Sequence, residues 1–205
     1  MADRVRILLA SSNAGKLREY PELAAGAPLD LERIPGFDDL PVFDESAPTF
    51  AENAAGKALH YSRFANDIVL ADDSGLVVPA LGGEPGVHSA RFAGANATDS
   101  DRNRKLLSRM RRMSGEDRRA RFVCVVALSS RGRVLAVVSD SVDGFLAEEP
   151  CGTNGFGYDA IFFYPAIGKT FAELDSSKKN PLSHRGKAFQ KMLDLFTGPG
   201  HLRFS

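Results

Sequence analysis

A polar segment with a single lysine, Ser11–Lys16, follows the first apolar run of the chain and precedes a helical pattern. Backbone N–H groups at the start of a helix bind phosphate, and a lysine there adds a full positive charge. A Walker A loop needs a glycine at position 10 and Ser or Thr after the lysine, and Ala10 and Leu17 exclude it. Two interpretations stay open: an anion site, or a plain helix N-cap with Lys16 on a solvated face.

Two adjacent carboxylates, Asp72 and Asp73, follow the apolar strand predicted at Ile68–Ala71. Neighbouring side chains of a strand point to opposite faces, so we expect the two carboxylates to serve different purposes. Strand ends in α/β sheets are common ligand sites, and Mg²⁺ takes one or two carboxylates plus substrate oxygens. With Ser74 and Gly75, the same residues also form a good turn, which is the alternative.

An acidic loop between Pro35 and Pro48 could supply a second carboxylate, although exposed acids of this kind are commonly only solvated. Its acids include Asp38, Asp39, Asp44 and Glu45. The next helix is predicted from Thr49 to about Ala65, with Glu52 at the capping-box position. Lys57 lies five residues after Glu52 on a nearby but not identical face.

The segment Cys151–Asp159 holds three glycines within six residues, which let backbone approach a ligand closely. Phe156 could stack on a base. The alternative is a hairpin loop whose aromatic side chains pack into the core.

The last predicted helix, Ser183–Phe196, begins with two cationic or ionisable residues, His184 and Arg185. Cations are disfavoured at a helix N-terminus, so their presence favours an anionic or polar ligand. An ordinary surface turn is the alternative.

Positioning these segments requires an α/β fold in which strands and helices do not strictly alternate, so a mixed sheet fits better than a doubly wound parallel one. The strands are predicted at Val5–Ala10, Leu29–Ile34, Ile68–Ala71, Arg121–Ser130, Arg133–Val138, Val142–Ala147 and Ile161–Tyr164. The turn residues Ser130, Arg131 and Gly132 predict that Arg121–Ser130 and Arg133–Val138 form a long hairpin, which Val142–Ala147 extends. A first helix is predicted from Ala14 to about Ala25, with a kink or early end at Pro21. Ala97 and Thr98, with Asp101, open another helix that is predicted to end near Met113.

The composition is that of an ordinary globular protein: 205 residues, 43% hydrophobic and 25% charged, which excludes disorder and a disulfide scaffold. We predict one domain over residues 1–205. Equal numbers of basic and acidic residues, 26 each, argue against a nucleic-acid-coating protein. Cys124 lies inside the apolar run Phe122–Leu128, which predicts a buried thiol, and with Cys151 it favours a reducing compartment. No segment approaches a membrane span or a signal peptide, so we predict a cytoplasmic location.

In their order along the chain, these segments resemble the inosine/xanthosine triphosphate pyrophosphatase family, hydrolases that remove non-standard purine triphosphates. The segments are ILLASSNAGKLRE, TFAENAAGKA, LADDSGLVVPALGGEPGVHSARFAG, GTNGFGYDAIF, GKTFAEL and SHRGKAF. The series covers nearly the whole chain. One departure is Ser12, which stands where the family usually has a glycine in Thr-Gly-Asn-x-Gly-Lys.

The resemblance implies an elongated mixed sheet flanked by helices, two lobes with a substrate cleft between them, and a homodimer. It implies cleavage between the α- and β-phosphates by water, with Mg²⁺ as the cofactor, giving a nucleoside monophosphate and pyrophosphate. It assigns Asp73 and Glu45 to the metal, Asp73 also to the general base, and Lys16 and Lys57 to the triphosphate charge.

The substrate-binding residues that the resemblance implies are Ser11, Ser12, Asn13, Ala14, Gly15, Lys16, Ser74, Phe156, Gly157, Tyr158, Asp159, Lys179, His184 and Arg185. Among these, Phe156 stacks on the purine and Arg185 donates to its 6-oxo group. Adenine presents a 6-amino donor there, and the unpaired buried group would cost about 1–3 kcal/mol.

Two alternatives remain open. Maf-type nucleotide pyrophosphatases share a similar opening strand but expect an arginine pair soon after it, which the sequence does not supply. A non-catalytic nucleotide-binding module would keep the pocket without hydrolysis, although both predicted metal carboxylates are present.

Overall fold

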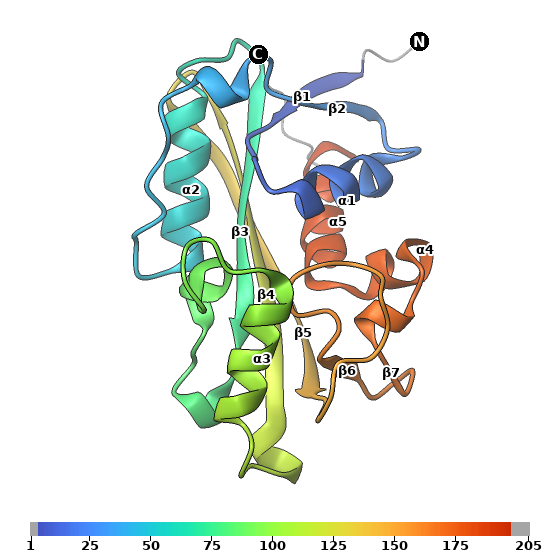
Figure 1. Ribbon diagram of the computed structural model, residues 1–205. Coiled ribbons are helices and arrows are strands. Elements are labelled where there is room, and N and C mark those ends of the chain that lie inside the picture. The colour runs from blue at the N-terminus through green and yellow to red at the C-terminus, as the bar shows by residue number, and fades with distance from the viewer. Residues whose placement is uncertain (1–3, 198–205) are drawn as a thin grey trace. The chain divides into compact units, whose positions relative to one another are not determined.

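A seven-stranded sheet organises the protein, for which the computed structural model describes residues 4–197. Its strand order is β2-β1-β3-β4-β5-β6-β7 (Figure 1). The strands are β1 (Val5–Leu9), β2 (Leu29–Arg33), β3 (Ile68–Val77), β4 (Arg119–Ser130), β5 (Arg133–Leu146), β6 (Phe162–Tyr164) and β7 (Lys169–Thr170). Strand β1 runs parallel to β2 and β3, whereas β6 runs antiparallel to β5 and β7. The sheet is therefore mixed, which confirms the predicted fold class.

Five α-helices accompany the sheet in the described part of the chain. They are α1 (Ala14–Ala24), α2 (Phe50–Tyr61), α3 (Asp99–Arg109), α4 (Ser176–Lys179) and α5 (His184–Thr197). None of the helices within residues 4–197 has the length and apolar character that crossing a bilayer demands.

The chain divides into two compact units, as the resemblance to a two-lobed family leads us to expect. The first unit consists of Met1–Asp73, Cys124–Asp140 and Arg185–Ser205, and the second of Ser74–Val123 and Ser141–His184. Strands β3, β4 and β5 each contribute residues to both units.

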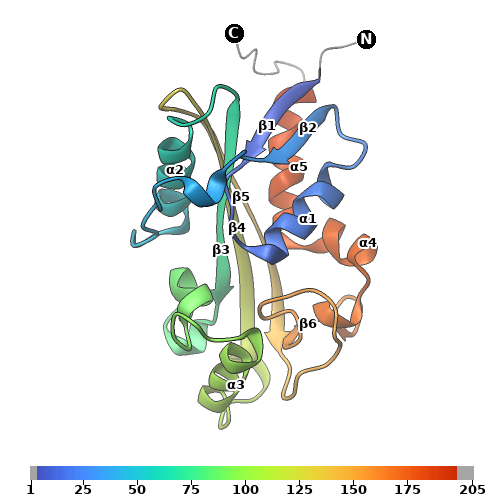
Figure 2. The same cartoon turned by 45° about the horizontal axis from the view of Figure 1, so that its top comes forward.

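In the first unit, α1 and α5 cover one face of the sheet and α2 covers the other (Figures 1 and 2). Alternation along β1 explains how one strand serves both layers, because Ile7 and Leu9 belong to the α1/α5 core while Leu8 points the other way. Tyr20 of α1 and Phe189 of α5 meet edge to face, with ring centroids 5.7 Å apart.

The second unit has its own apolar core, built around α3, β4 and β6. Leu106, Phe122 and Phe162 are among its buried members. Arg118 is buried beside it, and its guanidinium donates to the carbonyl oxygens of Leu146 at 2.8 Å and Ala147 at 2.6 Å, as well as to two carbonyls that follow α3. A buried charge is tolerated here because hydrogen bonds surround it.

Several element boundaries differ from the prediction; helix α3, for example, ends at Arg109 and not near Met113. Helix α1 runs through Pro21 and ends at Ala24, because fully buried Tyr20 keeps the last turn on the sheet, where tertiary packing outweighs one lost hydrogen bond. Helix α2 ends at Tyr61 rather than near Ala65. Strand β5 is continuous from Arg133 to Leu146, which confirms that the segment beginning at Val142 extends the predicted hairpin. The predicted turn is also confirmed, with positive φ at Arg131 and Gly132.

Candidate active site

Strand β3 continues through Asp72–Gly75 to Val77, so the turn considered from the sequence is wrong. The hydrogen-bonded ladder holds these residues extended, and both carboxylates are buried, Asp72 at 0% and Asp73 at 6% exposure. The predicted alternation is confirmed, because Asp72 pairs with Lys16 while Asp73 pairs with Asn53.

Asp72 is the centre of a buried ionic network. Its Oδ1 lies 3.0 Å from the Lys16 Nζ, and its Oδ2 lies 3.6 Å from the Arg185 Nε. The Cys124 thiol approaches Oδ2 at 3.8 Å. Burial by itself would raise the pKa of Asp72, but the charges of Lys16 and Arg185 hold it below its ordinary value. Asp72 therefore stays ionised and fixes two cations.

Glu19 completes this network and is a residue that the sequence analysis missed. Its Oε2 lies 2.5 Å from Arg185 Nη1, and both side chains are nearly inaccessible. Glu19 is three residues after Lys16, hence on the same face of α1. The sequence feature that could have identified Glu19 is an acidic residue on the buried face of a helix. The anion that offsets Arg185 at the start of α5 is thus the protein's own.

Asp73 differs from its neighbour Asp72 in both its hydrogen-bond partner and its pKa. Its Oδ2 accepts a hydrogen bond of 3.0 Å from the Asn53 Nδ2 of α2. Burial raises the pKa of Asp73 to about 6, with the charges of Glu45 and Asp72 adding to the rise and Lys16 and Asn53 opposing it. A carboxyl whose pKa lies this close to neutrality is suited to accepting a proton from water or to binding a cation.

The acidic loop before α2 is held against that helix, which brings Glu45 to Lys57. The Lys57 Nζ lies 2.6 Å from Glu45 Oε1. Asn53 donates to the Ala47 carbonyl and accepts from the Ala47 N–H, at 3.3 and 3.0 Å. The negative charge of Glu45 raises the pKa of Asp73, so the two carboxylates interact electrostatically. No pattern in the sequence indicated that Asn53 links this loop to β3.

A small cavity of about 160 Å³ opens beside this pair, within the first unit. Its wall is formed by Ser12, Phe37, Asp38, Leu40, Val42, Phe43, Glu45, Lys57 and Tyr61. Glu45, Lys57 and the exposed Ser12 of the Ser11–Lys16 segment therefore line the same cavity.

The Ser11–Lys16 segment caps helix α1. Asn13 is the N-cap, and its Oδ1 accepts the Lys16 N–H at 3.1 Å. Ser11 is buried, and its hydroxyl accepts the Asn13 N–H at 3.1 Å, whereas Ser12 is exposed. Gly15 and Lys16 are buried and Ala14 is exposed. The N-cap interpretation is confirmed, but Lys16 is 8% exposed and points to Asp72, so the solvated face is wrong.

In the second unit, the glycine-rich loop is organised by Asp159. Its Oδ2 accepts the Phe156 N–H at 2.9 Å and lies 2.5 Å from the Lys179 Nζ of α4. The Lys179 Nζ lies 5.3 Å from the centre of the half-buried Phe156 ring, a cation–π distance. A Cβ at Gly155 would approach the Asp159 carboxylate to 2.1 Å, so glycine is required there.

Two further predicted site residues are buried in the second unit. Tyr158 is 4% exposed and its hydroxyl donates to the Ser89 carbonyl at 2.8 Å. His184 is 5% exposed and stacks on Phe122 at 4.5 Å with nearly parallel rings. Ser74, on β3, is half-buried.

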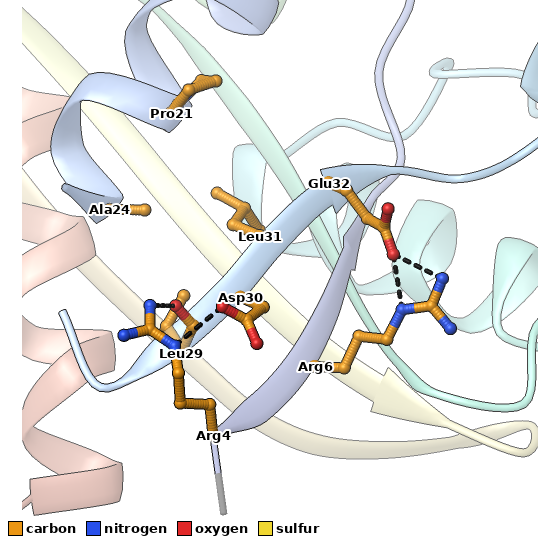
Figure 3. Close-up of a pocket in the computed structure, with 8 residues that line it drawn as sticks. All are labelled: Arg4, Arg6, Pro21, Ala24, Leu29, Asp30, Leu31 and Glu32. Atoms are coloured by element: carbon orange, nitrogen blue, oxygen red, sulfur yellow. Dashed lines mark hydrogen bonds and ion pairs between the residues drawn. The ribbon is translucent and has the colours of Figure 1, made fainter. Parts of the chain in front are cut away.

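A larger hollow at the edge of the sheet has the wrong chemistry for an active site. It measures about 470 Å³ and lies between α1 and strands β1 and β2 (Figure 3). Its arginines are already paired, Arg4 with Asp30 at 2.7 Å and Arg6 with Glu32, in exposed ion pairs. None of the predicted site residues lines it.

Comparison with known proteins identifies the family. The family model described as the Ham1 family matches residues 7–195. The chain belongs to the Ham1 family. A dITP/XTP pyrophosphatase of Geobacillus kaustophilus is 48% identical over 186 residues, 91% of each chain. One of Listeria monocytogenes is 41% identical over 187 residues, 91% of this chain and 92% of the relative. The structure of a HAM1 protein from Coxiella burnetii matches with a TM-score of 0.83 and 41% identity, covering 95% of this chain and 100% of that one.

The Ham1 match confirms the family resemblance drawn from the motifs and sets aside the Maf-type alternative. It spans both units and every predicted site residue, from Ser11 to Arg185. Within the first unit, the structure brings Lys16, Lys57, Glu45 and Asp73 into one charged group. Within the second, it brings Phe156, Asp159 and Lys179 together.

Proposed function

We propose that the protein hydrolyses non-standard purine nucleoside triphosphates, such as those of inosine, deoxyinosine and xanthosine, to the monophosphate and pyrophosphate. The observation that carries this proposal is buried Asp73, with its pKa of about 6, beside Glu45 and Lys16. The names of the dITP/XTP pyrophosphatases that resemble this chain support the substrate class.

The proposed cofactor is Mg²⁺, and the residues present fit it. Asp73 and Glu45 offer hard oxygen ligands, and Mg²⁺ needs only one or two carboxylates when phosphate oxygens and water supply the rest. Among residues 4–197 no group of three or more His, Cys, Asp or Glu side chains could hold a metal. A site of two carboxylates completed by substrate is consistent with that finding. When bound, the ion neutralises phosphate charge and orients the reacting group.

For the phosphates, we propose Lys16 and Lys57 as the charged partners, with the N–H groups at the start of α1 beside them. Each lysine is paired with a carboxylate, Lys16 with Asp72 and Lys57 with Glu45. Both ammonium groups are nearly buried, where they interact more strongly with an anion than they would in water. Asp73, when ionised, is the group suited to take the proton of the attacking water.

For the base, we propose that Phe156 stacks on the purine, while Asp159, Lys179, His184 and Arg185 meet its polar edge. The contact of Lys179 with both Asp159 and the Phe156 ring supports this, because it fixes the aromatic face and a donor together. The ion pairs of Arg185 with Glu19 and Asp72 hold its guanidinium in one orientation, as a selective donor requires.

We also propose that the enzyme is a homodimer located in the cytoplasm. The resemblance supports the dimer. The two free cysteines, Cys124 and Cys151, support a reducing compartment.

The decisive experiment is product analysis with a nucleotide panel. The enzyme is incubated with Mg²⁺ and inosine, xanthosine, guanosine or adenosine triphosphate, and phosphate is measured with and without added inorganic pyrophosphatase. We expect signal from inosine and xanthosine triphosphates only when pyrophosphatase is present, and phosphorus NMR should show the monophosphate and pyrophosphate. A nucleoside diphosphate product refutes the proposed cleavage site. Nucleotide binding without turnover refutes hydrolysis and identifies the protein as a non-catalytic nucleotide-binding module.

A further inference from the structure

The loop that carries Phe156 has little intrinsic rigidity. Phe156 stands between Gly155 and Gly157, which both have positive φ, 72° and 64°. Glycine restricts the backbone less than any other residue, so an aromatic ring between two glycines has no preferred direction of its own. Its direction must come from contacts around it, which include the Lys179 ammonium 5.3 Å from the ring centre and hydrogen bonds on either side of the ring.

One of these bonds comes from inside the loop and the other from a distant helix. The Phe156 N–H donates to Asp159 at 2.9 Å. The Gly157 N–H donates to Asp99 Oδ2 at 2.7 Å, across 58 positions of sequence. Asp99 is the first residue of α3 and belongs to the same compact unit as the loop.

Asp99 is itself held in place by Arg102. Its other carboxylate oxygen, Oδ1, pairs with the Arg102 Nη2. Arg102 is anchored in turn, because its Nη1 donates to the carbonyls of Ala90 at 3.0 Å and Ala97 at 2.5 Å. The arginine side chain is only 16% exposed. The carboxylate of Asp99 is thus fixed at both oxygens.

Capping of helix α3 does not explain why Asp99 carries a carboxylate at this position. Thr98 and Asp101 form a complete capping box, in which each side chain accepts the other's backbone N–H. A first-turn acid beyond that box adds a small helix-dipole term, yet Asp99 instead directs one oxygen to the glycine-rich loop.

We propose that Asp99 is a positioning residue that sets the direction of the Phe156 ring for stacking on the purine, with Arg102 orienting Asp99. This inference rests on the proposed function for the role of Phe156, but the clamp between Asp99 and Gly157 is testable without any nucleotide.

The first experiment uses a fluorescent reporter in the loop. The chain contains no tryptophan, so Phe156→Trp creates a single indole at the site. In that background, Asp99→Ala should at least double the acrylamide quenching constant and lower the indole anisotropy, because the loop loses its link to α3. Asp101→Ala is the matched control: it breaks the capping box of the same helix and should leave both readings unchanged. Equal readings for the two variants overturn the clamp.

The second experiment separates the base from the phosphates in the chain that keeps Phe156. Asp99→Ala should weaken inosine monophosphate binding by about tenfold in calorimetry, the loss expected for one hydrogen bond to a charged acceptor. Inhibition by pyrophosphate, which touches only phosphate-binding groups, should not change. A parallel loss of both, or no loss of either, refutes the positioning role. If the unmodified protein binds neither ligand, the proposed function fails while the fluorescence result still stands.

Asp99→Asn covers the case in which the alanine variant does not fold. The amide can still accept the Gly157 N–H, but it then turns an NH₂ group toward Arg102. We expect weakening of about threefold for the monophosphate and again none for pyrophosphate. Unchanged monophosphate affinity in the asparagine variant contradicts the proposal.

Discussion

Replacing Asp73 by asparagine should lower turnover by more than about 10²-fold and, at neutral pH, make the protein more stable. The pKa of Asp73 is raised from 3.8 to about 6, chiefly by burial. A rise of about 2 units at about 1.4 kcal/mol per unit means that ionised Asp73 costs the fold about 3 kcal/mol as an upper bound. The asparagine side chain would carry no charge, and its carbonyl can still accept the hydrogen bond from Asn53. We therefore expect a gain of about 1–3 kcal/mol at pH 8.

The sign of this effect depends on pH. Between about pH 4 and 6 the folded protein keeps a proton on Asp73 that the unfolded chain has released, so the Asp73 contribution to stability falls as the pH rises through that window. Well below pH 4 the carboxyl is neutral in both states. The advantage of Asp73→Asn should therefore be near zero at pH 4 and complete above pH 7.

Urea and thermal unfolding of both proteins at pH 4 and pH 8, in EDTA so that no cation binds the carboxylate, measure the difference. At pH 8 the variant should melt about 2–12 °C higher, since 1 kcal/mol shifts the midpoint of a chain of this size by about 2–4 °C. Turnover of inosine triphosphate should fall by more than about 10²-fold. A variant that is less stable at pH 8, or one that keeps its turnover, refutes this reading of Asp73.

Two further substitutions test the surroundings of the site. Arg185→Ala leaves Glu19 buried without its cation and Asp72 with Lys16 alone, so the free energy of unfolding should fall by about 3–5 kcal/mol in urea titration; a loss below about 1 kcal/mol contradicts the network. Gly56→Ala puts a Cβ 2.7 Å from the Phe43 ring and should push away the loop that carries Glu45, lowering kcat/KM about tenfold or more with unchanged helix content by circular dichroism. Adding Phe43→Leu should restore most of the lost kcat/KM. If it does not, the defect of Gly56→Ala does not arise from the contact with Phe43.

Patterns with a short range could be read from the sequence. The helix start at Thr98 and Asp101, the turn after Ser130 and the buried Cys124 are set by neighbouring residues or by one apolar run, and the structure confirms them. The mixed sheet was predicted on similar grounds, from strand and helix patterns that do not alternate. Family membership followed from the order of several motifs, which is a property of sequence alone.

Partners far apart in sequence could not be predicted in this way. Asp72 and Asp73 have the same chemistry, and only their places on β3 make one a permanent anion and the other a carboxyl that titrates near pH 6. Glu19, Asn53 and Asp99 each act on a residue at least 20 positions away.

The sequence by itself therefore determined which groups the protein has, which elements carry them and to which family it belongs, because helix caps, turns and apolar periodicity are local. Only the tertiary structure decided which charge faces which. Burial and the distance between charges set the pKa of a carboxyl and the partner of a lysine, and both arise when α1, α2 and α5 pack against the strands of the first unit.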